Sequence, residues 1–258
     1  MAGWEEDSYV MRHSKFLFLL AAFLFLLPAQ GSAVPLTSVQ VLIDVGHGGV
    51  DSGTSHGSIL EKDINLEVGK RLYRLLTEKG YRAVLNRDRD MALSDENQWL
   101  KNPSRHIRDL AQRRHLAKEM KPELMVSLHV NWSSDSRSRG PLVIYQANDQ
   151  SYWLASILQN RLNQLAKTNS HPVKGRTYYL LKQELCPTVI VEMGFISNRA
   201  DRALLTTPEQ QDKLARVISE ALEEYLLLTN DLQRKGSQAS FGKRQLGWWE
   251  RLRSTIRN

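Results

Sequence analysis

The sequence predicts an α/β fold: a single domain with a central, largely parallel, twisted sheet covered by helices on both faces. Short runs rich in β-branched residues recur along the chain, segments with a helical apolar period lie between them, and strand and helix alternate. With 41% hydrophobic and 24% charged residues among 258, the composition is that of a globular protein. Disordered, collagen-like and disulfide-scaffold proteins are therefore excluded.

The predicted strands are five short runs, and four helices fill the gaps between and after them. Strands are expected at residues 39–45, 82–85, 124–128, 142–145 and 188–191. Helices are expected from about residue 64 until Gly80, at about 107–120 and 151–167, and from Pro208, with Thr207 as its cap. Asp63 is the expected cap of the first helix.

Charge and cysteine content narrow the class of protein further. The chain has 35 Lys+Arg against 28 Asp+Glu, a formal net charge of +7, which favours an anionic partner such as nucleic acid, a membrane surface or an acidic polymer. The single cysteine, Cys186, excludes an intramolecular disulfide and a thiolate metal cluster. The fold is therefore expected to be stable without intramolecular disulfide bonds.

The first 33 residues read as an export segment rather than as part of the fold. An unbroken apolar run at residues 16–27 follows Arg12 and Lys15 and precedes a stretch of small residues. Twelve apolar residues fall short of the roughly 20 that span a bilayer, and the pattern is typical of a secretory signal cleaved after residue 33. An uncleaved anchor and a start at Met11 are the alternatives. In each case the folded part is expected outside the cytoplasm.

The last 30 residues differ in composition from the domain expected over residues 34–228. Residues 229–258 hold seven Lys/Arg against two acidic residues, a balance of 7 − 2 = +5. Trp248 and Trp249 lie among these cations, a combination that suits an anionic membrane surface or wall polymer. A flexible, solvated tail is the alternative.

Three predicted strands lead into side chains that bind metals or move protons. The first runs into the loop that holds His47, the third into His129, and the fifth into Glu192. Because ligands of open parallel sheets bind outside the carboxyl ends of the strands, these residues are expected to form one site. Two histidines and one glutamate are a known catalytic zinc set that leaves one position open.

Each of these residues also has a structural interpretation. His129 could be a satisfied structural histidine, and Glu61, just before the first helix, could be a solvated carboxylate favoured by the helix dipole. Glu192 could form an ion pair with an arginine. Beside a metal it would instead serve as a general base, because a buried carboxylate is costly unless it is paired or used.

Four blocks, in order, resemble the zinc-dependent N-acetylmuramoyl-L-alanine amidases of the amidase type 3 family. They are VLIDVGHGGVDSG, EKDINL, SLHVN and VIVEMGFISN, and the resemblance covers about residues 39–228. The resemblance implies one Zn²⁺ held by His47, Glu61 and His129, with Glu192 as the catalytic carboxylate. The reaction it implies is hydrolysis of the amide between muramic acid and L-alanine of peptidoglycan.

The resemblance also leads to finer expectations. Asn65 and Asn131 match motif positions and are expected to support the ligands or to contact substrate, and Val45 stands where the family usually has proline. The short exported form, without a repeated wall-binding module, is similar to amidases that act on spore cortex; a vegetative wall amidase is the competing enzyme. The peptidoglycan substrate is the expected partner, and a monomer is expected.

Two other classes of protein compete with an enzyme. A non-catalytic peptidoglycan-binding protein on an amidase scaffold is the first, although degenerate copies normally lose a ligand or the carboxylate, and this chain keeps all four. A nucleic-acid binder is the second. The export signal and the lack of a basic and aromatic motif in the core argue against it.

Overall fold

The computed structural model describes residues 38–182 and 185–256, with side chains as far as residue 232. Its centre is a six-stranded sheet of order β4-β1-β5-β8-β6-β7. The strands are β1 (Val41–Val45), β4 (Ala83–Leu85), β5 (Leu124–Asn131), β6 (Leu142–Tyr145), β7 (Val173–Lys174) and β8 (Thr188–Phe195). All neighbours pair in parallel except β6 and β8, so the predicted largely parallel sheet is confirmed.

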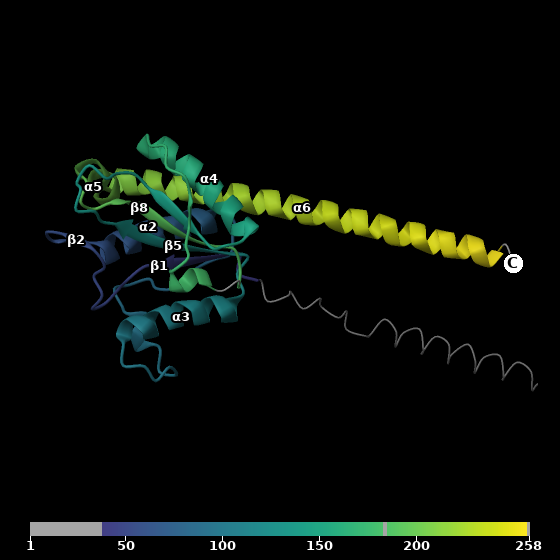
Figure 1. Ribbon diagram of the computed structural model, residues 1–258, viewed down its shortest axis with the longest axis horizontal. Coiled ribbons are helices and arrows are strands. Elements are labelled where there is room, and N and C mark those ends of the chain that lie inside the picture. The colour runs from purple at the N-terminus through teal and green to yellow at the C-terminus, as the bar shows by residue number, and fades with distance from the viewer. Residues whose placement is uncertain (1–37, 183–184, 257–258) are drawn as a thin grey trace, which may run out of the picture. The chain divides into compact units, whose positions relative to one another are not determined.

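Helices cover both faces of the sheet, as predicted (Figure 1). They are α2 (Glu61–Glu78), α3 (Arg105–Met120), α4 (Asp149–Ala166), α5 (Arg199–Thr206) and α6 (Pro208–Ile256), with 3₁₀ turns η1 (Leu93–Asp95) and η2 (Tyr179–Lys182). Figure 1 shows α2, α4 and α6 on one side of the sheet and α3 on the other. A separate hairpin of β2 (Ser55–His56) and β3 (Ile59–Leu60) leads into α2.

Alternate residues of each strand face opposite helix layers, because successive side chains of a strand point to opposite faces. In β1, Val41 and Ile43 belong to the large apolar cluster with α2, α4 and α6, whereas Leu42 packs with Ala117 of α3. Full burial of each such aliphatic side chain contributes roughly 1.5–3 kcal/mol. This packing fixes the strand register and so decides which residues meet at the sheet edge.

Two helix starts test the sequence interpretation. Pro208 is the first residue of α6, as predicted. The expected cap Asp63 was wrong: α2 begins at Glu61, and its N-cap Leu60 offers no side-chain hydrogen bond. The backbone just before the β2–β3 hairpin holds the first turn instead, since the Glu61 N–H donates to the carbonyl of Thr54, the residue before β2, at 2.9 Å.

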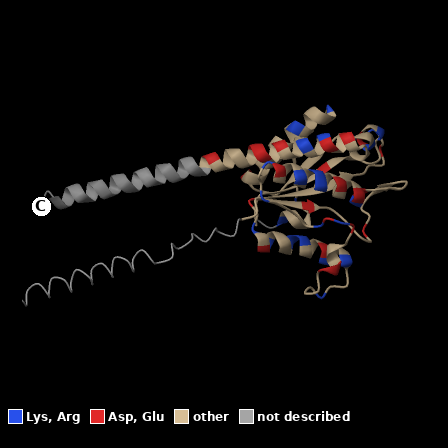
Figure 2. Ribbon diagram, turned by 180° about the vertical axis from the view of Figure 1, so that it is seen from behind, with Lys and Arg blue, Asp and Glu red and all other residues tan. Residues whose placement is uncertain are grey.

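Helix α6 continues through the segment where a flexible tail was an alternative, as far as Ile256. Figure 2 shows acidic and basic residues mixed along its described part. The boundary at residue 228 and the membrane role of the tail stay predictions, and the side chains past residue 232 lie outside the description. The export segment, residues 1–33, also lies outside it. No helix within residues 38–182 and 185–256 is both long and apolar enough to cross a membrane.

Candidate metal and catalytic centre

The loop after β1 places His47 at the carboxyl edge of the sheet. His47 has a left-handed backbone (φ 59°), and so does Gly49 two residues later (φ 58°). A non-glycine residue in this region is uncommon. The turn closes through the hydrogen bond from the Gly48 N–H to the Asp51 carbonyl at 2.9 Å. The loop thus turns back over the end of β1 and aims the imidazole at the start of α2.

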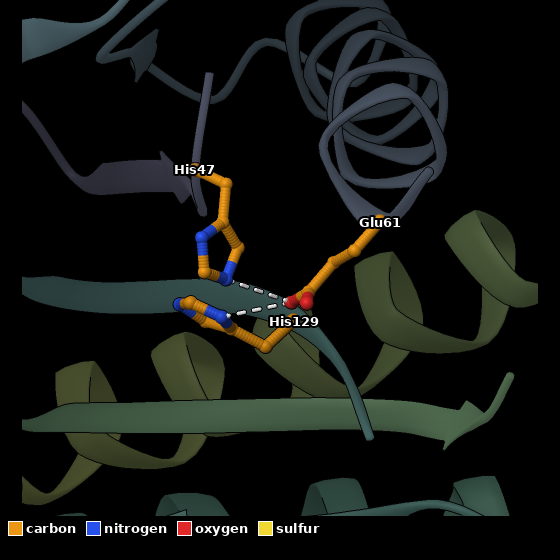
Figure 3. Close-up of side chains that lie close together, drawn as sticks. All are labelled: His47, Glu61 and His129. Carbon is orange, nitrogen blue, oxygen red and sulfur yellow. Dashed lines mark hydrogen bonds and ion pairs between the residues drawn. The ribbon is translucent and has the colours of Figure 1, made fainter. Parts of the chain in front are cut away.

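His47, Glu61 and His129 converge on one point from three elements (Figure 3). Glu61 Oε1 lies 3.1 Å from His47 Nε2 and 3.1 Å from His129 Nδ1, and the Val130 N–H donates to the same oxygen at 2.9 Å. His129 lies inside β5, whereas the sequence placed it just after the strand. The structure therefore brings together the three residues predicted as metal ligands.

The arrangement fits a zinc ion. The candidate donor atoms lie within 4.8 Å of one another. Tetrahedral zinc ligands at about 2.0–2.1 Å from the ion stand roughly 3.3 Å apart, close to the spacing of the Glu61 oxygen from each ring nitrogen. Imidazole nitrogen and carboxylate oxygen are zinc donors.

Two glycines leave room for these side chains. A Cβ on Gly46 would lie 2.5 Å from Cε1 of His129, and a Cβ on Gly53 would lie 2.5 Å from Oε2 of Glu61. Distances this short do not occur in real structures, so any larger residue would displace a candidate ligand. Gly53 is also left-handed (φ 62°), which glycine adopts without steric cost. The glycines of the first block thus shape the cradle that holds the three side chains.

Asp51 orients His47, and the sequence interpretation had missed it. Asp51 Oδ2 accepts from His47 Nδ1 at 2.9 Å, which leaves Nε2 facing the cluster. Carboxylates hold metal-ligating histidines in this way in many proteins. The spacing of four residues after His47, inside the glycine-rich loop, was the signal that could have identified it.

Interactions within the cluster shift the pKa values of His47 and Glu61. Burial opposes the charge on His47, yet hydrogen bonds and charge from Glu61 and Asp51 raise its pKa to about 9. Burial likewise opposes the charge on Glu61, but His129 and His47 hold the pKa of its carboxyl far below the usual range. Glu61 is therefore an anion at neutral pH, as a metal ligand must be.

Glu192 lies beside the cluster on the adjacent strand. It is paired in register with His129, so the two side chains leave neighbouring strands on the same face of the sheet. Burial raises the pKa of the Glu192 carboxyl, and the nearby charge of Glu61 adds to this against the opposing effect of His129. A carboxyl group with a raised pKa accepts and releases a proton more readily near neutral pH.

The two predicted asparagines lie at different depths. Asn65 is completely buried, and its amide donates to the Gly46 carbonyl at 3.3 Å and to Glu61 Oε1 at 3.4 Å. That position suits support of a ligand rather than contact with substrate. Asn131 is half-buried at the end of β5, and its side-chain oxygen accepts from the Trp132 N–H at 2.8 Å.

Two buried arginines donate hydrogen bonds to the backbone of the His47 loop, and the sequence interpretation missed both. Arg113 of α3, 2% exposed, donates to the Asp44 carboxylate at 2.8 Å and to the His47 carbonyl at 3.0 Å. Arg87, also 2% exposed, donates to the Gly46 carbonyl at 3.0 Å. Asp44 inside a buried strand was the signal, because a buried carboxylate requires a partner.

These arginines carry opposite pKa shifts. Burial opposes the charge on Arg113, but Asp44 and Asp109 raise its pKa above the usual range. Burial and the neighbouring charge of Arg113 lower the pKa of Arg87 to about 10, although the charges of Asp90, Asp44 and Asp109 oppose this. Both remain cations at neutral pH.

Val45 differs from the proline expected by resemblance, and the structure shows what its N–H does. It donates to Oδ1 of Asn86 at 2.8 Å, a bond that proline cannot make. Asn86 also bonds Asp44 through its amide nitrogen. The end of β1 is thus tied to the residue that follows β4.

The fold and the convergent site define an α/β domain with a candidate His-Glu-His metal centre and an adjacent buried carboxylate. The model of the N-acetylmuramoyl-L-alanine amidase family matches residues 41–224. The chain belongs to this family.

Relatives and solved structures agree with that assignment. The germination-specific N-acetylmuramoyl-L-alanine amidase of Bacillus subtilis (strain 168) is 31% identical over 202 residues, covering 77% of this chain and 84% of that protein. The uncharacterized protein YqiI of the same organism is 32% identical over 212 residues, covering 81% and 95%. The CwlD amidase from Clostridioides difficile, solved in complex with the GerS lipoprotein, is 31% identical with a TM-score of 0.68, covering 74% and 99%.

Proposed function

We propose that this chain is a zinc-dependent hydrolase that cleaves the amide between N-acetylmuramoyl residues and L-alanine in peptidoglycan. The observation that carries the proposal is the meeting of His47, Glu61 and His129, with Glu192 in register beside them. Family membership supports the substrate class.

His47, Glu61 and His129 would hold one zinc ion. When bound, the ion supplies a Lewis acid that polarises a carbonyl and makes water more acidic. Asp51 fixes the ring of His47 with Nε2 toward the cluster, and Asn65 supports the Glu61 carboxylate from beneath. Asn131, at the open end of β5, is the candidate contact with substrate.

Glu192 is the proposed catalytic residue. Hydrolysis forms a bond between the carbonyl carbon and a water oxygen and breaks the bond to the alanine nitrogen. The Glu192 carboxylate takes a proton from the attacking water and then delivers it to the departing amine. Its raised pKa suits both halves of this transfer, because the group must be able to hold the proton between the two events.

We place the activity outside the cytoplasm, in spore cortex. The likeness to a germination-specific amidase and to CwlD supports the cortex, and the predicted export segment supports the location. Vegetative wall remodelling is the competing role. CwlD in complex with a lipoprotein makes a protein partner a further candidate, besides the membrane surface or wall polymer suggested by the tail.

The test is an assay of the purified full chain on spore and vegetative peptidoglycan, reading new L-alanine amino termini and intact glycan. Chelation should stop release and zinc should restore it. Glu192→Gln should lower release by at least about 100-fold, the scale of lost general acid–base catalysis. The exposed Glu78→Gln is the matched control. Zinc binding without hydrolysis of either substrate would instead favour a non-catalytic peptidoglycan-binding protein.

A further inference from the structure

A groove of about 670 Å³ lies at the carboxyl edge of the sheet, between the loop after β5 and the turn from β8 into α5. Three arginines line it: Arg139, Arg199 and Arg202. Its remaining polar lining includes Ser136, Ser197 and Asn198. We call this the arginine groove.

The positive charge of the arginine groove is not neutralised by ion pairs. Within residues 38–182 and 185–256, none of its three guanidinium groups has a carboxylate oxygen within 4.0 Å. Arg139 donates to the Ala166 carbonyl at 2.7 Å and Arg202 to the Ile196 carbonyl at 2.8 Å, while Arg199 is exposed. Both carbonyl partners are uncharged, so the groove favours an anion.

Asp201, a buried acid next to the lining of the groove, does not pair with the arginines. Asp201 is 4% exposed, and its Oδ2 accepts from the backbone N–H groups of Gly140 and Phe195 at 2.6 and 2.8 Å. The carboxylate of Asp201 therefore ties the two segments together beneath the groove. Asn198 caps α5 by accepting from the Ala200 and Asp201 N–H groups. The arginine side chains thus remain the donors available to a ligand.

Hydrogen bonds join the two segments that follow β5 and β8 and lead to the arginine groove. The Ile196 N–H donates to the Asn131 carbonyl at 2.8 Å, and the Ser133 N–H donates to Oγ of Ser197 at 3.1 Å. Ser197 follows Glu192 by five residues. At about 3.3 Å per residue, the groove therefore begins within roughly 17 Å of Glu192.

The stem peptide of the substrate has a length of the same order as this upper limit. A peptidoglycan stem begins with L-alanine and continues with γ-linked glutamate and later residues that keep free carboxylates. At most about 3.6 Å per residue, and somewhat more across a γ-link, places the carboxylates of the second to fourth residues roughly 7–15 Å from the scissile amide. The stem is therefore long enough to carry its acidic part toward the groove while the amide lies at Glu192.

We propose that the arginine groove is the subsite that binds the carboxylates of the stem peptide. The proposal rests on the proposed amidase function and deepens it, because it assigns the residues that select an acidic stem. An anionic wall polymer is the other candidate occupant. The stem is favoured because the segments that line the groove follow β5 and β8, the strands that carry His129 and Glu192, and are hydrogen-bonded to each other.

The test uses the full chain and two soluble muramoyl tetrapeptides, one with free stem carboxylates and one with carboxamides in their place. For the double variant Arg139→Gln/Arg199→Gln we expect KM on the acidic substrate to rise about tenfold, as for the loss of charge-assisted hydrogen bonds, with kcat little changed. For the wild-type chain, KM on the carboxamide substrate should be higher than on the acidic substrate by a similar factor. On the carboxamide substrate, the double variant should have nearly the same KM as the wild type. Arg216→Gln, which removes an exposed charge from α6, is the matched control.

Calorimetry with the free acidic tetrapeptide separates this proposal from the proposed function, because it needs no turnover. Binding that weakens about tenfold in the double variant supports the groove even if no substrate is hydrolysed. Hydrolysis with equal KM in wild type and double variant, or on both substrates, overturns the groove and leaves the amidase intact. The groove proposal is also overturned if the variants lose only binding to walls that retain anionic polymer.

Discussion

Two groups of arginines lie at the same edge of the sheet and differ in what their charges meet. Arg87 and Arg113 are 2% exposed and donate to Asp44 and to carbonyls of the His47 loop. Arg139 and Arg199 are exposed, and the described chain gives them no carboxylate. A guanidinium group whose N–H donors all bond within the protein holds the backbone in place. A guanidinium group with unused N–H donors can bind a ligand.

The largest expected effect on stability comes from a substitution among the buried arginines. Arg113→Met leaves the Asp44 carboxylate buried without its cation and should destabilise the chain by about 3–5 kcal/mol. Urea unfolding followed by circular dichroism measures this, with Arg216→Met as the control. A loss below about 1 kcal/mol would show that the pair does not hold the loop, and the contrast between the two groups would fail.

An intermediate effect is expected at Asp51, which bonds the candidate ligand His47. Asp51→Asn keeps the side-chain shape but weakens the hold on His47, and zinc affinity should fall about tenfold. Competition with a chromogenic chelator measures the affinity, and Asp88→Asn, at an exposed neighbour of Arg89, is the control. Unaltered zinc affinity would contradict the orienting role of Asp51.

The smallest effect is expected in the arginine groove. Arg199→Gln removes a charge that no described carboxylate meets, so the free energy of unfolding should change by less than about 0.5 kcal/mol. The same urea measurement tests this. A clear destabilisation would mean that Arg199 holds the fold, as Arg113 does, and the two groups would no longer differ in kind.

Much of the fold was predictable because strand and helix periods were local and clear. The five predicted strands occur, and His47, Glu61 and His129 meet as expected. The extension of β5 and β8 past the apolar runs was not predictable, since it depends on pairing between distant strands. Nor could the sequence identify Arg113 as the partner of Asp44, 69 positions away, because that choice follows from how α3 docks on the sheet.

The strand order also has a kinetic consequence. Ser127 of β5 bonds Asp44 of β1 across 83 positions of chain, and His129 pairs with Glu192 on a strand still further along. Pairings of such long sequence separation are entropically costly and form late in folding. No local segment can therefore assemble the centre by itself. A partly folded chain therefore lacks the candidate site, which forms only once β8 has paired with β5.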